Sequence, residues 1–321
     1  MATKRATTVR RVAAPARVHR VRDPAARASV LAPLEVVTRA KVNLSLEVIR
    51  RRPDGYHEIE TILQSIDLAD RMRVELTSDA KIEITCATPG IPTDAANLCH
   101  RAILAMRAVA GRSLGARIVL EKHIPAGAGL GGGSSNAAGI VRAVDRALAL
   151  ELPTKRLEKI AASLGSDVPF MLHGGTMVGR GRGEIVTPLV PLKGAFFVVV
   201  KPEVSIPTVW VYSNLSFRLT GHRPRLNLRA VSAVLARFPK APLPFRNALE
   251  EVVFPAYPSV AKLWEELVSE RPCFASMTGS GSAVFAIFDR EARANEVAER
   301  FSVRGLFASV AKPAKQAVDI R

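Results

Sequence analysis

Residues 125–136 read PAGAGLGGGSSN, and this glycine-rich stretch decides how the chain is interpreted. It follows an apolar strand predicted at 116–120 and leads into residues 137–148, where apolar side chains recur at helical spacing. Glycine permits backbone conformations that a side chain forbids, so consecutive amides can turn toward one point. The positive end of the following helix adds to such a cradle. The stretch therefore predicts a phosphate-binding loop, and a nucleotide is the expected ligand.

Other glycine-rich loops fit this chain less well. Gly127, Gly129 and Gly132 match the dinucleotide fingerprint, but that motif needs a second parallel strand after its helix. Here Glu151-Leu152-Pro153 leads into another predicted helix at 154–164. No Walker motif occurs, and a flexible linker does not explain a position between a strand and an amphipathic helix.

The residues before and after the loop predict a mixed α/β region. Polar and apolar residues alternate over 41–48, which indicates a strand with one buried face. Further strands are expected near 58–67, 71–77 and 81–86, and Asn97 is expected to cap a helix that ends near residue 109. We also expect Ser134, Ser135 or Asn136 to cap the helix after the glycine loop, and Pro169 to stand in the first turn of a later helix.

The second half of the chain has a different order of elements. A strand is predicted at 195–200, and helical segments follow near 226–237, 246–253 and 258–270. Two strands at 274–276 and 283–288 flank Thr278-Gly279-Ser280-Gly281-Ser282, before a helix at 290–301 and a strand at 306–311. This order is typical of a ferredoxin-like module.

Composition limits the class of protein. The chain has 321 residues, 48% of them hydrophobic, and no apolar run long enough to span a bilayer. Its three cysteines form no CxxC pair, so we expect reduced thiols and a cytoplasmic location rather than a disulfide or zinc framework. The net charge of +17 permits nucleic acid, an acidic membrane surface or anionic small molecules as ligands.

The first 32 residues carry eight basic residues and one acidic residue. We expect residues 1–32 to be a disordered basic tail, and a transit peptide is the alternative because such segments are Arg-rich and acid-poor. The next domain is expected at 33–185 and contains the predicted nucleotide-binding loop. A second domain is expected at 190–321, since glycine and proline are dense between the two.

Six stretches together resemble the GHMP kinase superfamily of small-molecule kinases. The resemblance covers about residue 34 to the end, and the glycine loop is specific to the superfamily only. The Asp-Gly-Tyr-His turn points further, to the members that phosphorylate a cytidine-diphosphate methylerythritol. The stretches are residues 40–44 (AKVNL), 52–57 (RPDGYH), the glycine loop, 165–170 (GSDVPF), 202–208 (PEVSIPT) and 277–281 (MTGSG).

The resemblance implies an α+β, two-domain GHMP kinase fold. Its N-terminal β/α domain would be ribosomal-protein-S5-domain-2-like, and its C-terminal domain ferredoxin-like. The implied reaction transfers the γ-phosphoryl group of ATP to the 2-hydroxyl of the methylerythritol moiety, in the non-mevalonate isoprenoid (isopentenyl diphosphate) pathway. Mg²⁺ is expected because ATP reacts as its magnesium complex.

The same resemblance implies roles for particular residues. Asp167 matches the catalytic aspartate and would be the general base, with Lys41 beside it to stabilise developing negative charge. An Asp before Val-Pro also fits a helix N-cap, and a lysine at a strand end is by itself more typical of a solvated charge. The nucleotide contacts would come from the glycine loop and two outlying residues: Pro125, Ala126, Gly127, Ala128, Gly129, Leu130, Gly131, Gly132, Gly133, Ser134, Ser135, Asn97 and Lys122.

The acceptor substrate is expected at a second set of side chains. Tyr56 and His57 would lie against the cytosine base, and Tyr212 would form a second aromatic wall, since a flat base gains from stacking on a ring. Asn43 and Thr208 are the polar candidates. Lys122 fits a surface charge equally well, and Tyr212 also fits a strand-edge residue.

The expected partners are therefore ATP and a small-molecule acceptor, with no membrane and no nucleic acid. Neither the metal ligands nor the oligomeric state follow from the sequence. Another GHMP kinase is the first alternative, and a basic nucleic-acid-binding protein is the alternative from a different class. A nicotinamide-dependent enzyme is the third.

Overall fold

The computed structural model describes residues 32–215 and 226–321. The expected basic tail lies outside the described residues, apart from residue 32. Residues 31–321 form one compact unit. Within the described ranges, no helix has the length and apolar character that crossing a membrane requires.

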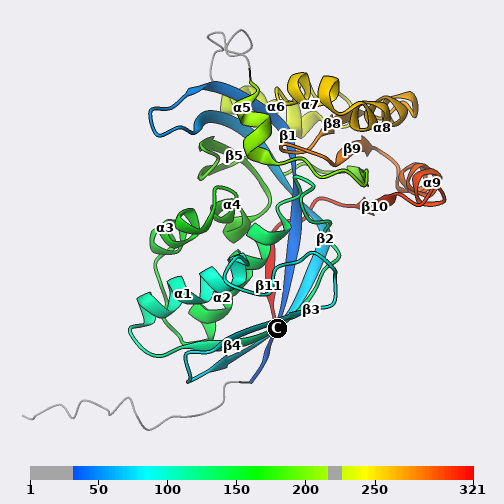
Figure 1. Ribbon diagram of the computed structural model, residues 1–321. Helices are drawn as coiled ribbons and strands as arrows, with labels where there is room; N and C mark the ends of the chain where they lie inside the picture. Colours follow the sequence, from blue (N-terminus) through cyan, green and yellow to red (C-terminus); the bar gives the residue numbers. More distant parts are fainter. Residues whose placement is uncertain (1–31, 216–225) are drawn as a thin grey trace, which may run out of the picture. The chain divides into compact units, whose positions relative to one another are not determined.

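Two β-sheets form the frame of this unit (Figure 1). The strands of the first sheet are β1 (Leu34–Arg51), β2 (His57–Thr77), β3 (Ile82–Cys86), β4 (Gly115–Glu121), β5 (Thr176–Gly181), β6 (Ile185–Pro188) and β11 (Val318–Ile320). The strands of the second sheet are β7 (Phe196–Lys201), β8 (Phe274–Met277), β9 (Val284–Phe288) and β10 (Phe307–Ala311).

The helices fall into two groups along the chain. Those before the second sheet are α1 (Leu98–Ala110), α2 (Gly132–Ala147), α3 (Thr154–Leu164) and α4 (Val168–His173). Those between or after its strands are α5 (Thr208–Ser213), α6 (Leu228–Arg237), α7 (Glu250–Ala256), α8 (Pro258–Ser269) and α9 (Glu291–Ser302).

The first sheet is built on the long antiparallel pair β1 and β2. Its main order is β11-β1-β2-β4-β3, and β5 pairs with the other end of β2. Helices α1, α2, α3 and α4 lie together against one face, as Figure 1 shows, and a hydrophobic cluster that includes Val36, Met72, Ile118 and Ile140 fills the interface. The α+β architecture expected for the first half is therefore present.

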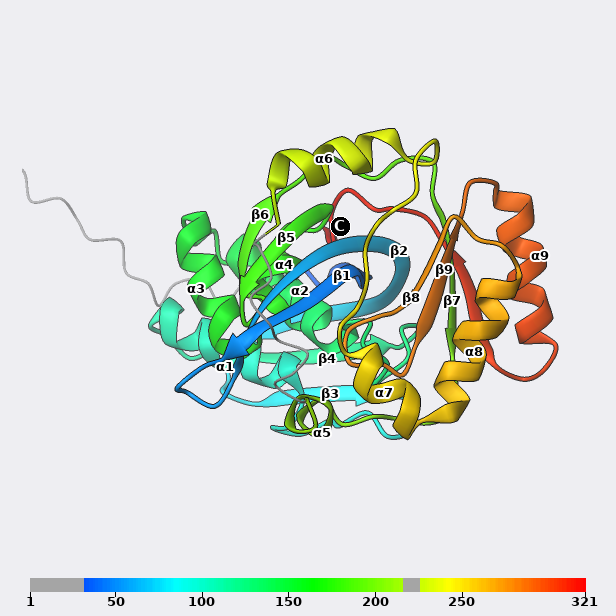
Figure 2. The same ribbon diagram turned by 90° about the horizontal axis from the view of Figure 1, so that it is seen from above.

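The second sheet confirms the ferredoxin-like prediction. Its order is β10-β7-β9-β8, all neighbours are antiparallel, and helices separate β7 from β8 and β9 from β10. Alternate side chains face opposite sides. Phe197 and Val199 join a cluster with Val42 of β1, whereas Val198 and Val200 join the cluster under α7, α8 and α9. Figure 2 shows α8 and α9 along one face of this sheet.

The structure corrects several predicted elements. The strands expected at 58–67 and 71–77 are one continuous strand, β2. The polar face of β1 is buried rather than exposed, since Lys41, Asn43 and Ser45 are each 3% exposed. Helix α2 begins at Gly132, and no side chain caps it, so the predicted cap by Ser134, Ser135 or Asn136 is wrong.

The end of the chain also differs from the prediction that all of residues 190–321 belong to the second domain. Strand β11 pairs with β1, so the last residues belong to the first sheet although they follow all four strands of the second. The predicted cap Asn97 is confirmed, because its side-chain oxygen accepts the Cys99 N–H.

Candidate active site

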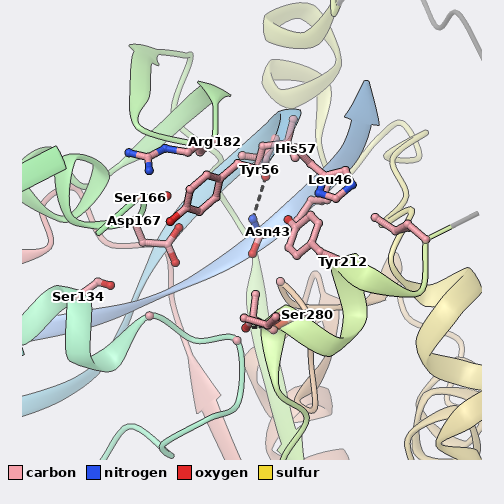
Figure 3. Close-up of a pocket in the computed structure, with 18 of the residues that line it drawn as sticks. Asn43, Leu46, Tyr56, His57, Ser134, Ser166, Asp167, Arg182, Tyr212 and Ser280 are labelled. Atoms are coloured by element: carbon pink, nitrogen blue, oxygen red, sulfur yellow. Dashed lines mark hydrogen bonds between the residues drawn. The ribbon is translucent and has the colours of Figure 1, made fainter. Parts of the chain in front are cut away.

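A pocket of about 740 Å³ opens where the two sheets meet the glycine loop. Its walls come from β1, β2, the start of α2, the turn before α4, helix α5 and the 279–280 turn. Among the sequence-predicted site residues, the pocket is lined by Lys41, Asn43, Tyr56, His57, Gly129, Gly131, Ser134, Asp167, Thr208 and Tyr212. Figure 3 shows Asp167 pointing into it between Ser134 and Tyr56.

The glycine loop presents its N–H groups rather than its carbonyls. Within residues 32–215 and 226–321, no backbone N–H from Ala126 to Ser134 donates a hydrogen bond to another protein group. The carbonyls of this segment are used instead. Those of Ala128 and Leu130 accept the Ala283 and Lys41 N–H groups at 3.2 and 3.0 Å. A run of free donors with occupied acceptors is an arrangement suited to an anion.

The loop is held in this shape by its neighbours. The side chains of Ala128 and Leu130 are buried in the core between the two sheets. The Gly129 carbonyl lies 3.1 Å from the Thr278 hydroxyl, and a Cβ on Gly129 would lie 2.1 Å from the Thr278 carbonyl oxygen. Since Gly129 also has a φ of +75°, only glycine fits this contact without displacement.

Gly131 connects the loop to α2. It has a φ of +71° and is the N-cap residue of the helix. A Cβ there would lie 2.5 Å from Met171 and 3.1 Å from the Lys41 side chain. The absence of a side chain therefore lets the helix N-terminus approach both the catalytic candidate Lys41 and α4.

Lys41 and Asp167 lie side by side in the pocket. The Lys41 Nζ is 3.5 Å from Asp167 Oδ2 and donates a hydrogen bond of 2.6 Å to Asn43 Oδ1. The Lys41 side chain is 4% exposed, whereas that of Asp167 is 35% exposed. The alternative of a solvated lysine is therefore wrong. The carboxylate remains accessible to a ligand while the ammonium is fixed behind it.

Asp167 stands at the N-cap position of α4, but its side chain makes no capping hydrogen bond. Pro169 lies in the first turn, as predicted. The helix is therefore begun by the proline and the local backbone, and the carboxylate is free for another role. The side-chain capping that the sequence also permitted does not occur.

Asn43 links the site to the second sheet. Its Nδ2 donates to the Thr61 hydroxyl at 2.8 Å, a contact drawn in Figure 3, and its N–H donates to the Thr278 hydroxyl at 3.2 Å. Thr208 lies across the pocket, with its hydroxyl 2.8 Å from that of Ser280. These hydroxyls are fixed by neighbouring groups before any ligand arrives.

Three aromatic residues line the other end of the pocket. The rings of His57 and Tyr212 are stacked, with centroids 5.2 Å apart. Tyr56 is 55% exposed, and the guanidinium of Arg182 lies 4.8 Å from its ring centre. Burial and the charge of Arg51 lower the pKa of His57, so its imidazole is neutral at pH 7. Burial raises the pKa of Tyr212, and the Asp167 charge adds to that effect.

The pocket does not include every predicted residue. Those that lie outside its lining are Pro125, Ala126, Gly127, Ala128, Leu130, Gly132, Gly133, Ser135, Asn97 and Lys122. Ser135 is buried, and its hydroxyl donates to the Arg39 carbonyl. The Lys122 side chain is only 5% exposed and pairs with Asp70, so the surface-charge interpretation is wrong.

Other lining residues were not singled out from the sequence. Arg51, Asp54 and Arg182 place further charges at the rim. A hydrogen bond from Arg52 lowers the pKa of Asp54. Asp54 lies inside the Arg-Pro-Asp-Gly-Tyr-His stretch, so this motif could have identified it as a pocket residue. Arg182 lies just beyond β5 and reaches the pocket only because β5 pairs with β2.

The described residues contain no group of three or more His, Cys, Asp or Glu side chains that could hold a metal ion. Asp54 and Asp167 are the carboxylates among the pocket's lining residues, and Asp167 lies on the same side as Ser134 of the glycine loop. This donor set fits a magnesium ion that arrives on a triphosphate, since Mg²⁺ commonly keeps several waters and phosphate oxygens as ligands. It does not form a separate protein cage.

Comparison with known proteins assigns the chain to a class of kinases. Residues 97–175 match the GHMP kinases N terminal domain, and residues 236–304 match the GHMP kinases C terminal domain. The chain is 40% identical to 4-diphosphocytidyl-2-C-methyl-D-erythritol kinase of Geobacter sulfurreducens over 82% of its own length and 93% of that protein. It is 38% identical to the enzyme of that name from Gloeobacter violaceus, over 77% and 82% of the two chains.

Solved structures agree with this assignment. A crystal structure of 4-(cytidine 5'-diphospho)-2C-methyl-D-erythritol kinase superposes with a TM-score of 0.73 at 35% identity, covering 87% of this chain and all of that one. Homoserine kinase from Cytophaga hutchinsonii has a TM-score of 0.67 at 18% identity, covering 90% and 97%, which shows a shared fold. The chain belongs to the GHMP kinases, and within them to the family of 4-diphosphocytidyl-2-C-methyl-D-erythritol kinases.

Proposed function

We propose that the chain transfers the γ-phosphoryl group of ATP to the 2-hydroxyl of 4-diphosphocytidyl-2-C-methyl-D-erythritol. One observation carries the proposal: a run of free backbone N–H groups, from Ala126 to Ser134, reaches the pocket of Lys41 and Asp167 at Gly129, Gly131 and Ser134. Phosphoryl transfer depends mainly on positioning and on stabilising charge, and these groups supply both. The family relatives named for this reaction support the choice of acceptor.

In this proposal the loop amides and the N-terminus of α2 bind the phosphates. The sixteen-residue helix directs its positive end toward the pocket through Gly131 and Ser134. Of the predicted nucleotide contacts, Asn97 and Lys122 have their side chains committed to protein partners, so we assign them supporting rather than direct roles. Mg²⁺ is expected to enter with ATP and to neutralise phosphate charge.

Asp167 is proposed as the general base that accepts the proton of the 2-hydroxyl. Its carboxylate is accessible, makes no capping bond and adjoins an ammonium held by Asn43. Once a proton leaves the hydroxyl, negative charge develops on the attacking and transferred oxygens. The Lys41 ammonium lies where it can stabilise that charge.

The cytidine moiety is proposed to bind at the aromatic end of the pocket. Tyr56, His57 and Tyr212 provide flat surfaces, and the neutral imidazole of His57 can both donate and accept a hydrogen bond. Arg51 and Arg182 contribute positive charge at the same rim, where the substrate's diphosphate is negative. Thr208, one helical turn before Tyr212 on α5, is the candidate contact to the middle of the substrate.

A panel of acceptors tests the proposal. Purified protein with ATP and Mg²⁺ is mixed in turn with the cytidine-diphosphate substrate, mevalonate and homoserine, and ADP release is followed. Turnover confined to the first acceptor is the expected result. Turnover on mevalonate or homoserine alone would move the chain to another GHMP kinase, and no ADP release with any acceptor would contradict the substrate class.

A further inference from the structure

The buried carboxylate of Asp70 accepts hydrogen bonds from residues at both ends of the glycine-rich stretch. Asp70 of β2 is fully buried, and one of its oxygens accepts the His123 and Ile124 N–H groups, both at 2.8 Å. The other oxygen accepts the Lys122 ammonium and, at 3.0 Å, the side-chain amide of Asn136. Residues 122–124 immediately precede the 125–136 stretch, and Asn136 is its last residue and part of α2.

The charges in this cluster are enclosed by protein. The side chains of Asp70 and Lys122 are 0% and 5% exposed. A buried carboxylate without a partner is costly, so the four donors that converge on Asp70 keep the pair stable. Asn136 completes the connection, since it donates to the Thr38 hydroxyl at 2.7 Å and accepts from the Lys122 ammonium at 3.2 Å.

The cluster of Asp70, Lys122 and Asn136 adjoins the first residue of α2. A Cβ built on Gly132 would be 2.9 Å from Lys122 Nζ, so the ammonium approaches the first residue of the helix. Positive charge at a helix N-terminus is unfavourable unless an anion compensates it. Asp70 compensates the positive charge through its ion pair with Lys122. A phosphate bound at the loop amides would add a second negative charge near the same helix N-terminus.

We propose that Asp70 is a positioning residue for the nucleotide. By joining the strand that enters the loop to the helix that leaves it, the carboxylate fixes the spacing between the two stems and thus the direction of the loop amides. This role rests on the proposed binding of ATP at the glycine loop. It assigns to Asp70 an effect on nucleotide affinity and none on the acceptor site, which is built from other residues.

Asp70→Asn tests the role. The new amide would still offer an oxygen to His123 and Ile124, but its NH₂ group would face the Lys122 ammonium and the Asn136 amide, which are donors. We expect affinity for a nonhydrolysable ATP analogue with Mg²⁺, measured by calorimetry, to fall about tenfold, the worth of one charge-assisted hydrogen bond. The KM for ATP should rise to match, while the KM for the acceptor stays unchanged.

Glu60→Gln is the matched control. Glu60 is also a buried acid of β2, paired with Arg180, but it lies at the other end of the strand. Its replacement should lower the melting temperature without changing analogue affinity. Equal losses of affinity in the two variants would overturn the proposal, because they would show a general effect of destabilisation.

Asn136→Ala provides a second test if Asp70→Asn does not fold. It removes the helix-side hydrogen bonds to Asp70, Lys122 and Thr38 and leaves the buried ion pair, so a severalfold loss of analogue affinity is expected. Wild-type affinity in this variant, or in folded Asp70→Asn, would overturn the role of the cluster. A wild-type protein that binds no analogue would instead contradict the nucleotide site itself.

Discussion

Lys41 shows how neighbours decide the role of a residue. The alternation of β1 predicted a polar face, and a lysine on such a face is usually solvated. Here the ammonium is enclosed by Asn43, Asp167 and the glycine loop, with its Nζ 3.3 Å from where a Cβ would stand on Gly279. A buried ammonium needs partners, and these two oxygen-bearing residues supply them. The family resemblance indicated the role, but only the structure explains why the charge is stable there.

Asp167→Asn should lower turnover by about three orders of magnitude, within the range for loss of a general base. The amide keeps the size of the side chain but cannot accept the proton of the hydroxyl. Binding of a nonhydrolysable ATP analogue should persist, which calorimetry would measure beside steady-state rates. Asp145→Asn, which alters an acid of α2 that is bonded to the Leu152 N–H, serves as the control. Near-normal turnover of Asp167→Asn would refute the assignment.

Tyr212 is expected to act through its ring rather than its hydroxyl. Burial keeps that hydroxyl protonated, and the ring stacks on His57. Tyr212→Ala should raise the KM for the cytidine substrate by about ten- to a hundredfold, since stacking contributes about 1–3 kcal/mol per base. Tyr212→Phe should stay close to wild type. If the phenylalanine variant loses as much as the alanine variant, the hydroxyl and not the ring carries the contact.

At the scale of single residues, the sequence predicted which residues form the site better than it predicted how those residues are arranged. Lys41, Asp167 and the three aromatic residues were predicted, and the pocket contains them all. Their roles remain predictions. Arg182 was missed because nothing in its own neighbourhood places it beside Tyr56. That contact depends on long-range pairing of β5 with β2, which local patterns do not encode.

Among the elements, helices and short strands were predicted best. The helix at 154–164 and the strands at 81–86 and 116–120 agree with the structure to within a residue or two, because each is bounded by turn residues and has a clear period. The continuity of β2 was missed, since three of the five residues in Asp67–Arg71 are charged and interrupt the apolar pattern of the strand. In the structure Asp67 is bonded to the Lys312 N–H, and Asp70 supports the glycine loop.

The start of α2 was predicted too late because the rule for capping did not apply. Serine and asparagine at 134–136 resemble an N-cap, but the helix begins earlier at Gly132, after a glycine in the left-handed conformation. No side chain satisfies the first amides there. In our proposal a phosphate does so instead, which explains why a conventional cap is missing at this position.

Gly129→Ala should damage the loop through a backbone clash. The new Cβ would lie 2.1 Å from the Thr278 carbonyl oxygen, which cannot move without shifting the 278–282 turn. We expect the free energy of unfolding to fall by about 2–3 kcal/mol and ATP analogue binding to be lost. Gly90→Ala is the control, since Gly90 has the same φ, +76°, but open space around it. Equal behaviour of the two variants would show that the contact is unimportant.

Glu250 connects α7 to the second sheet and gives a pH-dependent test. Its carboxylate accepts the Ser276 hydroxyl and the Met277 N–H, both at 2.7 Å, and burial raises its pKa. The folded protein therefore retains this proton at pH values where the unfolded chain releases it. The stability contributed by Glu250 is thus greatest below its unfolded pKa of about 4.5 and is lost as pH rises through the folded value.

Glu250→Gln keeps the accepting oxygen and removes the titration. The free energy of unfolding of wild type, minus that of the variant, should decrease as the pH is raised from 4.5 toward 8. Chemical denaturation at several pH values measures it. Two stability profiles that stay parallel across this range would contradict the expected role of burial at Glu250.

In the molecule as a whole, the site is assembled where the two sheets meet. β1 contributes side chains to all three hydrophobic clusters, and its Lys41 and Asn43 line the pocket. The 278–282 turn of the second sheet holds the glycine loop through the hydrogen bond from the Thr278 hydroxyl to the Gly129 carbonyl. The C-terminal strand β11 then returns to β1. The chain therefore leaves the first sheet for the second and ends in the first again, with β11 beside β1. No local pattern of the sequence reveals this pairing.

The strong positive charge is a property of the entire chain. The first 32 residues hold a sizeable share of the +17, yet the residues proposed for catalysis and binding lie from Lys41 onward. Deletion of residues 1–31 should therefore leave kcat and both KM values unchanged in the ADP-release assay. It should weaken salt-sensitive binding to RNA, if the full-length chain shows any. Loss of kinase turnover on deletion would contradict this separation.

The most direct measurement is a crystal structure of the protein with the cytidine-diphosphate acceptor and a nonhydrolysable ATP analogue. Our account predicts that the phosphates contact the N–H groups between Ala126 and Ser134, with the acceptor's 2-hydroxyl between the γ-phosphorus and Asp167. Phosphates bound away from these amides, or a hydroxyl out of reach of Asp167, would contradict it.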